Sequence, residues 1–476
     1  MTAIPILSGI YSDTTPNLRT SYPKNMVPII KDSGISKGYL KPASGIIQFN
    51  NSNVACPGID RGGVVWNGLL YRVLGSKLCL ITADGSIKIL ADVGNDLKPV
   101  SIGYSFDKMY IGSSKSLFYW NGTLTKVTDN NLGIVIDVIW MDGYYVTTDG
   151  INIIVTNLAD PTTVNPLAYG SPLNEPSQIY ALEKFREELY CFKRFSISVY
   201  DNVGNSSGTS YFPFQVNNGA LISRGCVGTK AKCLFNFEYF VFVGGGVNEP
   251  ISIYAAIDGQ SNKISTREID TILEGYTELQ LSTIVIDQLI DKENQFLYIH
   301  LPDRTIVYDA KASEAMSISV WFYLSSSLRG YETYQARFIL WAYGVWVSGD
   351  PTQARLGYFT DYQSDHYGVD VEWMFGTTII YNSTMGVLFH ELELILLAGK
   401  MENDANSTVY TSYSTDLQTW SREYPRSAGK IGNRNIRLNW LQQGNMRNMR
   451  VQRFRGLSDA HLAIASIEAR MEALNA

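Results

Sequence analysis

Short runs of alternating apolar and polar residues, separated by turn residues, dominate the first 360 positions of this 476-residue chain. The run 62–94 shows the pattern most clearly. It predicts four strands, at 64–66, 69–73, 77–82 and 86–91. The dipeptides Asn67-Gly68 and Asp84-Gly85 between them suit tight primed hairpin turns. Four strands in about 30 residues make one antiparallel sheet, which is the size of a propeller blade.

The same pattern recurs along the chain at fairly even steps. Each copy has an aromatic residue shortly after a turn, namely Tyr71, Tyr110, Tyr145, Tyr190, Phe240, Tyr298 and Trp346. Propeller blades run about 40–50 residues, and one such sheet cannot bury both faces unless copies pack beside it. The sequence therefore predicts a mainly β protein with a β-propeller of five to seven blades, six being favoured, over 62–360. A stack of sandwiches is the alternative.

The regions that flank the repeats have their own character. Residues 1–61 hold six prolines among scattered Ser, Thr and Asn, and predict an extended N-terminal arm with little regular structure. Residues 361–456 lose the blade rhythm and predict a small antiparallel β-sandwich-like domain. Inside the repeats, 265–281 has apolar residues at helical spacing, and predicts one short helix from about Thr266 to Gly275.

The last segment, 457–476, predicts a C-terminal amphipathic helix. Ser458 and Asp459 suit its first turn, and apolar residues then step by four and three along one face. The large side chains of that face are Ile464, Ile467, Met471 and Leu474. Such a helix either packs on its own domain or docks on a neighbouring chain. We expect these four residues to contribute to a contact with another subunit or a partner.

Charge is unevenly distributed along the chain, whose formal net charge is −6. Residues 421–456 hold nine Lys or Arg against Glu423, a net of +8, which leaves −14 for the rest. Opposite charges on separate regions suit an oriented contact between subunits, whereas a solvated strand edge is the simpler interpretation. The candidate contact residues are Arg447, Arg450, Arg453 and Arg455. Nucleic-acid binding is a weaker interpretation, because few aromatic residues interleave the stretch.

Residue patterns typical of catalysis are missing from the sequence. The four histidines share no ligand spacing, and neither a phosphate loop nor a nucleophile elbow occurs. The run 414–420 resembles an Asp-box hairpin, in which the Asp side chain fixes a turn. We also expect neither a signal peptide nor a membrane span, since no stretch of 18 apolar residues exists. The expectation is therefore a protein without catalytic, cofactor or metal sites.

Four stretches in order carry a resemblance to a known family. They are Tyr22-Pro23-x-Asn25-Met26, then Gly38-Tyr39-Leu40 with Gly45-Ile46, then 67–78 (NGLLYRVLGSKL), and finally 299–310 (IHLPDRTIVYDA). Together they are similar to the tail-hub protein of short-tailed phages, also called the packaged-DNA stabilisation protein or tail nozzle. The similarity runs from about residue 22 to about residue 310 and continues more weakly to about 455. The segment 458–474 has no counterpart in it.

The resemblance implies a structural protein without catalytic residues. Six copies would form a homohexameric ring below the portal and its head–tail adaptor ring. The ring would continue the DNA channel, retain the packaged genome, and attach tailspikes or tail fibres and a distal needle or plug. Double-stranded DNA would pass through the lumen without sequence-specific binding. The protein would belong to the virion tail and be assembled in the host cytoplasm. The alternative class is a carbohydrate-binding or glycan-cleaving propeller of a phage or bacterial surface.

Overall fold

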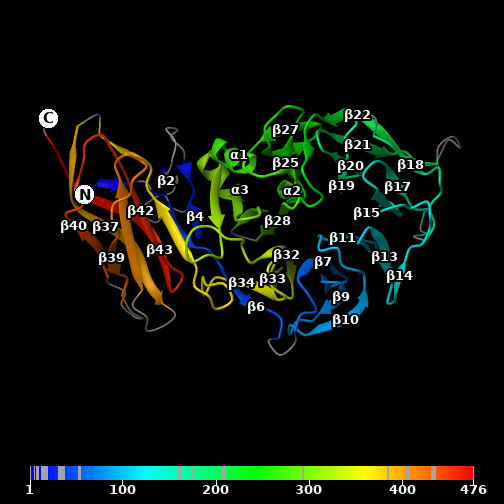
Figure 1. Cartoon of the computed structure of the whole chain (residues 1–476), viewed down its shortest axis with the longest axis horizontal. Coiled ribbons are helices and arrows are strands. Elements are labelled where there is room, and N and C mark those ends of the chain that lie inside the picture. Colours follow the sequence, from blue (N-terminus) through cyan, green and yellow to red (C-terminus); the bar gives the residue numbers. More distant parts are fainter. Residues whose placement is uncertain are drawn as a thin grey trace.

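Strands make up most of the chain in the computed structural model, and its helices are short. The structure describes residues 2–4, 6, 10–11, 20–30, 38–51, 55–158, 160, 162–172, 175–204, 211–291, 294–382, 385–401, 407–429 and 436–474. A ring of small sheets and a two-layered sandwich lie next to each other along the long axis of the molecule (Figure 1). This arrangement confirms the expected mainly β protein.

The first repeat folds as a four-stranded antiparallel sheet. Its strands are β7 (Asp60–Trp66), β8 (Leu69–Leu74), β9 (Lys77–Ile81) and β10 (Ile87–Asp92). Asn67 and Gly68 both have positive φ, as a primed turn requires. At Asp84-Gly85 only Gly85 does, so the expected second primed turn was wrong. The Asp84 carboxylate instead accepts hydrogen bonds from Ser86 Oγ and Thr82 Oγ1, which favours a longer turn.

The described residues form seven blades, each with three or more consecutive strands. The second and third blades are β11 (Ser101–Tyr104), β12 (Met109–Ser113), β13 (Ser116–Trp120) and β14 (Leu124–Lys126), and β15 (Asp137–Met141), β16 (Tyr144–Thr148), β17 (Ile153–Val155) and β18 (Tyr169–Gly170). The fourth and fifth are β19 (Ile179–Phe185), β20 (Glu188–Lys193), β21 (Ile197–Asn202) and β22 (Phe214–Ile222), and β23 (Gly225–Cys226), β24 (Lys232–Phe235), β25 (Tyr239–Gly245), β26 (Ser252–Ile257) and β27 (Gln260–Lys263). The sixth and seventh are β28 (Val285–Ile290), β29 (Gln295–His300), β30 (Thr305–Asp309) and β31 (Val320–Leu324), and β32 (Arg337–Ala342), β33 (Val345–Gly349) and β34 (Leu356–Thr360).

The N-terminal arm closes the ring. Strand β6 (Gly45–Gln48) pairs with β34 as the outermost strand of the seventh blade. The blade number of six was therefore wrong, although seven lies within the expected range. Each of the seven landmark aromatics of the sequence lies on the second strand of a blade, counting the split β23 and β24 as one strand. Shared strands from distant parts of the chain are a common way to lock a propeller, because the first and last blades then cannot separate easily.

In the part of the chain that the structure describes, three short helices lie between the propeller strands. They are α1 (Arg267–Glu274), α2 (Glu278–Leu281) and α3 (Ala310–Met316). The first confirms the predicted helix, with Thr266 and Gly275 at its caps. The second was not foreseen; Thr277 and Gln280 form a capping box at its start.

The sandwich consists of two sheets that share one apolar core. The larger sheet holds β4 (Met26–Ile30), β5 (Gly38–Pro42), β43 (Ala460–Ala473), β37 (Val387–Met401) and β40 (Leu438–Leu441), with β1 (Thr2–Ile4) and β41 (Asn445–Met446) at its margins. The smaller holds β35 (Glu372–Gly376), β42 (Met449–Leu457), β38 (Thr408–Ser414) and β39 (Tyr424–Ser427), with β36 (Ile380–Tyr381) beside β42. A separate pair is formed by β2 (Ile10–Tyr11) and β3 (Thr20–Ser21). The described arm thus supplies strands to both domains, and the expectation of little regular structure was wrong.

The predicted C-terminal helix is a strand. Ser458 and Asp459 form a turn between the two sheets, and β43 then pairs with almost the whole length of β37. Helix-favouring Ala, Glu and Met gave a local preference, but such preferences are weak and tertiary pairing overrides them. The register between β37 and β43 shifts at several positions, which interrupts the alternation of inward and outward side chains along β43. The apolar residues of this segment therefore do not repeat every two positions in the sequence.

Candidate functional site

Residues 23–25 form an extended segment between the two domains. The backbone of Lys24 exchanges hydrogen bonds with that of Met374 on β35, at 2.8 and 3.0 Å. The N–H of Asn25 donates to the carbonyl oxygen of Tyr323 on β31, at 2.8 Å. Because β31 belongs to the sixth blade and β35 to the sandwich, one short segment is hydrogen-bonded to both domains. We call residues 23–25 the junction segment.

The side chain of Lys24 is a buried cation at this junction. Its Nζ donates to Oε2 of Glu372 and Oγ of Ser327, both at 3.0 Å, and to the carbonyl oxygen of Gly330 at 2.5 Å. Burial lowers the pKa of Lys24, and the Glu372 carboxylate acts in the opposite direction. The side chains of both ions are almost fully buried, and either charge without the other would be strongly destabilising. The pair therefore fixes how the domains meet.

Asn25 completes the junction with its amide group. Its backbone is left-handed, with φ of 51°, a conformation that asparagine tolerates better than most residues. Its Nδ2 donates to the carbonyl oxygens of Ser325 and Glu372, each at 2.8 Å, and its Oδ1 accepts from the Ser325 N–H at 3.0 Å. The stretch at residues 22–26 thus joins the propeller to the sandwich. The sequence drew attention to Asn25 but not to Lys24.

Arg72 and Asp60 hold the first blade against the seventh. Nη1 of Arg72 donates to Oδ2 of Asp60 at 2.7 Å. Its Nη2 donates to the carbonyl oxygens of Phe338 and Val347, at 2.9 and 3.0 Å. Burial raises the pKa of Asp60, and Arg72 opposes this effect. A Cβ atom at Gly349 would clash with the Asp60 carboxylate, so glycine is required for this close approach.

The buried carboxylate of Asp137 and the partly buried one of Asp287 also connect neighbouring blades. Asp137 of the third blade accepts from the N–H of Leu182 in the fourth at 2.8 Å, and from Oγ of Ser101 in the second. Asp287 of the sixth blade accepts from the N–H of Phe338 in the seventh at 2.6 Å. These contacts tie side chains of one blade to the backbone of the next. They make the ring a stiff unit.

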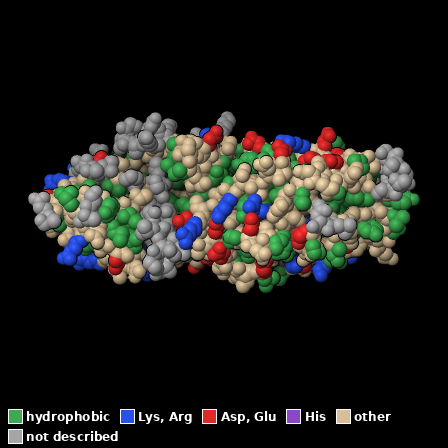
Figure 2. Space-filling model, turned by 90° about the horizontal axis from the view of Figure 1, so that it is seen from above, with side chains coloured by type: hydrophobic (Ala, Val, Ile, Leu, Met, Phe, Trp, Pro, Cys, Tyr) green, Lys and Arg blue, Asp and Glu red, His purple; other side chains and the backbone are tan. Residues whose placement is uncertain are grey.

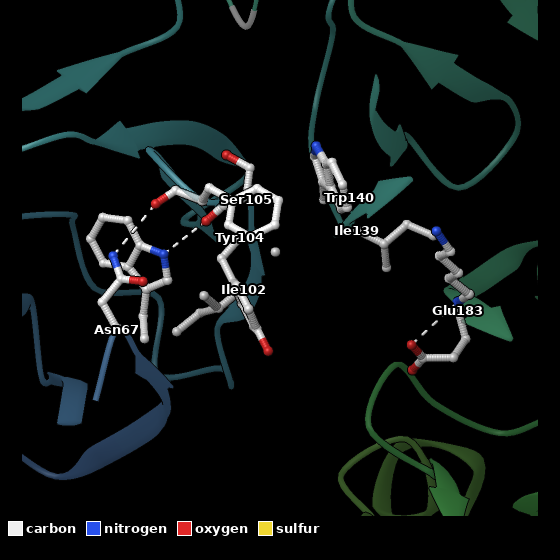
Figure 3. Close-up of a pocket in the computed structure, with 11 residues that line it drawn as sticks. Asn67, Ile102, Tyr104, Ser105, Ile139, Trp140 and Glu183 are labelled. Carbon is white, nitrogen blue, oxygen red and sulfur yellow. Dashed lines mark hydrogen bonds between the residues drawn. The ribbon is translucent and has the colours of Figure 1, made fainter. Parts of the chain in front are cut away.

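A pocket of about 500 Å³ opens between the first four blades. Figure 3 shows Asn67 and Tyr104 on one side of it, and Trp140 and Glu183 on the other. Nζ of Lys184 lies 5.6 Å from the ring centre of Trp140. The pocket is lined mainly by aromatic and aliphatic side chains, which suits apolar contacts more than chemistry.

One carboxylate, that of Glu183, lines this pocket. It is ion-paired with Lys232 at 2.5 Å. Hydrolysis of a glycosidic bond needs two carboxyl groups that flank the scissile bond, and the described residues that line this pocket include one carboxylate. Among the residues that the structure describes, no group of three His, Cys, Asp or Glu side chains is placed to hold a metal ion. None of the described helices is long and apolar enough to cross a membrane.

The apolar candidates for an interface lie in different surroundings. Ile464 and Ile467 are fully buried in the core of the sandwich, and Met471 packs against that core. Their side chains are therefore used within the chain and are not free for another subunit. Leu474 is 37% exposed and remains a candidate.

The arginine candidates are divided as well. Arg450 is fully buried between the rings of Phe389 and Tyr413, and burial lowers its pKa to about 10. Arg455 is ion-paired with Glu423. Arg453 lies half-buried with its guanidinium carbon 4.1 Å from the ring centre of Trp420. Arg447 is exposed in the turn between β41 and β42. Lys430 and Arg434 of the same basic stretch lie outside the described residues.

The hairpin at 414–420 has the structural role expected of it. Oδ1 of Asp416 accepts from the backbone N–H groups of Gln418 and Thr419, at 3.0 and 2.8 Å. These bonds hold the pKa of Asp416 well below its usual range.

Comparison with known proteins identifies the family of this chain. Residues 2–364 match the family described as bacteriophage P22 Gp10, beta-propeller, and residues 372–472 match bacteriophage P22 Gp10, beta-sandwich. The chain belongs to the P22 Gp10 family. A relative, "Tail hub protein gp10" of Salmonella phage P22, is 24% identical over 485 residues, which cover 98% of this chain and 99% of the relative. The expected resemblance, the propeller with a sandwich, and a structural protein of the phage tail in place of an enzyme are thereby confirmed.

Solved structures show only loose likeness. The WD40 domain of Neurospora crassa Pan2 has a TM-score of 0.40 and 8% identity, over 66% of this chain and 94% of that one. The N-terminal domain of Nup159 has a TM-score of 0.39 and 10% identity, over 72% and 99%. Scores this low carry no argument about function.

Proposed function

We propose that this chain is the subunit of a homohexameric tail hub. The ring continues the DNA channel below the portal and adaptor ring, retains the packaged DNA, and anchors tailspikes or fibres and the distal needle or plug. The observation that carries the proposal is the family match along both domains, from residue 2 to residue 472. The ring-closing contacts and the junction segment support it, because a conduit wall needs subunits that do not deform.

The distribution of charge supports passage of DNA without capture. Binding of DNA phosphates requires Lys and Arg groups that can displace counterions. In the basic stretch, Arg450 is buried, and Arg437 and Arg455 are ion-paired with Glu393 and Glu423. Each chain carries a formal charge of −6, so six copies would carry −36. We propose a lumen that is acidic overall and repels the DNA that slides through it.

The test is the size and symmetry of the purified protein. Light scattering after size exclusion should give six times the chain mass of 53.2 kDa, and electron microscopy should show six-fold rings. A ring whose lumen is lined mainly by arginines of 421–456 would contradict the acidic lumen. A protein that stays monomeric and cleaves a capsular glycan would overturn the hub and favour the alternative class.

A further inference from the structure

Exposed aromatic side chains gather at one end of the propeller axis. In each blade the hairpin after the innermost strand lies at the same end of the axis, because every blade repeats the same strand order. Phe106 and Phe237 lie in two such hairpins, and Trp341 lies near the end of β32 just before a third; they are 91%, 80% and 53% exposed. Tyr104 and Trp140 line the pocket together with Phe106. We call these five residues the mouth crown.

The rim of the mouth crown is acidic. The described residues of its hairpins include three bases, and each of these is already ion-paired, in the pairs Lys108–Asp107, Lys184–Asp142 and Arg186–Asp258. Within the described part of the chain, the hairpin carboxylates of Glu187, Glu188 and Glu238 form no ion pair. Large aromatic groups with a rim of polar charge are typical of protein interfaces. The surface therefore fits an apolar partner that carries positive charge.

A surface of that kind lies on the sandwich. Tyr381, Met385 and Leu474 are exposed there, and Arg447 stands next to them. Pairing brings these residues together: Tyr381 is opposite Met449 of β42, Val387 is opposite Met446 of β41, and the Leu474 N–H donates to the Gly386 carbonyl oxygen. We call Tyr381, Met385, Arg447 and Leu474 the sandwich tip.

The sandwich tip and the mouth crown are on different domains. Figure 1 shows the red trace that follows β43 at the side of the sandwich away from the propeller, and Leu474 directly follows β43. Figure 2 shows Lys and Arg side chains at the sandwich end of the molecule. In the described residues Arg447 has no ion-pair partner in its own chain. One chain therefore offers two unlike surfaces that complement each other but do not meet within it.

We propose that the mouth crown of one subunit receives the sandwich tip of a second copy of this chain. The apolar tip side chains lie against the crown aromatics, and Arg447 lies against the carboxylates of the rim. Because the two surfaces differ, the contact is heterologous, and each subunit keeps one surface free for the next copy. When the rotation between neighbouring subunits closes, repetition of the contact gives a ring. This inference rests on the proposed hub function and specifies the contact that builds it.

The test uses two full-length variants and their mixture. The mouth variant carries Phe106→Ser and Phe237→Ser, and the tip variant carries Met385→Ser and Leu474→Ser. All four side chains are exposed, so we expect melting temperatures close to that of the wild type. Each variant alone should need at least tenfold more protein to assemble than the wild type, as followed by sedimentation velocity. Mixed in equal amounts they should form dimers, since one intact crown can still bind one intact tip.

A control variant carries Ile151→Ser and Leu279→Ser. These side chains are 73% and 79% exposed, close to those of the mouth variant, but lie on other connections of the propeller, so assembly should match the wild type. Two results would overturn the contact while leaving the hub in place: wild-type rings formed by either variant, or a mixture that stays monomeric. A wild-type protein that never assembles would instead refute the hub itself. Loss of assembly in the control would show that substitution of exposed apolar residues anywhere on the propeller prevents assembly. This result would also overturn the proposal.

Discussion

Nζ of Lys24 lies 3.0 Å from Oε2 of Glu372, although 348 residues separate the two in the chain. The first belongs to the N-terminal arm and the second to the first strand of the sandwich after the propeller. The chain therefore begins in the sandwich, forms the seven blades, and then forms the rest of the sandwich next to its first strands. The buried Lys24–Glu372 ion pair joins these two parts of the chain, so the arrangement of the domains depends on a few polar side chains.

Lys24→Met should destabilise the protein strongly. The substitution keeps most of the volume but leaves the Glu372 carboxylate buried without its main partner. Removal of one partner from a buried pair costs roughly 3–5 kcal/mol. Arg455, with Nη1 3.8 Å from Glu372, should limit the loss to the lower part of that range. Urea unfolding followed by tryptophan fluorescence gives the free energy of unfolding.

The matched control for Lys24→Met is Lys41→Met. Lys41 pairs with Asp361 at the same distance of 3.0 Å, but both side chains are substantially exposed. Solvent-exposed pairs contribute about 0–1 kcal/mol, so this variant should unfold almost like the wild type. Equal losses in the two variants would show that the junction pair has no special structural role.

Arg72→Met should loosen the closure of the ring. The variant removes the cation from Asp60 and the donors from the carbonyl oxygens of Phe338 and Val347. We expect a loss of roughly 3–5 kcal/mol, and faster hydrogen exchange at amides of the first and seventh blades. Lys77→Met, in an exposed pair with Asp92, is the control and should change little. An equal increase in hydrogen-exchange rate across all blades would contradict a local effect.

The strands of the blades could be predicted from the sequence because nearby turn residues and alternating apolar residues determine them. Asn67-Gly68 fixes a hairpin whatever lies around it, and the aromatic landmarks fall on one strand of every blade. The strand at residues 460–473 follows a different rule. Its partner β37 lies about 70 residues earlier, and only that pairing converts a helix-favouring segment into a strand.

The surfaces were harder to foresee than the fold. A cluster of arginines in the sequence gave no indication that Arg450 would be buried and Arg447 exposed, since three residues of spacing carry that difference. Phe106, Phe237 and Trp341 come from blades far apart in the chain, and only closure of the ring brings them to the same end of the propeller axis. Surfaces built from distant hairpins leave no spacing signal in a single sequence.

Substitutions in β43 should separate packing from assembly. Ile467→Ala removes a fully buried side chain of the sandwich core and should cost about 2–5 kcal/mol. Leu474→Ala, at the exposed tip, should leave the free energy of unfolding within about 0.5 kcal/mol of the wild type. Calorimetry on both variants checks this order. A stable Ile467→Ala protein that fails to assemble would instead support a role between subunits.

His366 should make the protein sensitive to mild acid. Burial lowers its pKa to about 3, and Arg355 acts in the same direction. In the unfolded chain the imidazole binds a proton near pH 6.5, whereas in the folded chain it stays neutral until about pH 3. The contribution of His366 to the free energy of unfolding is therefore complete above pH 6.5 and falls as the pH decreases toward 3. The slope from this one residue approaches about 1.4 kcal/mol per pH unit. His366→Gln, which keeps a hydrogen-bonding group near Ser326 Oγ, should flatten the dependence of the unfolding free energy on pH between 6 and 4. Parallel profiles for the variant and the wild type would show that other groups cause the acid sensitivity.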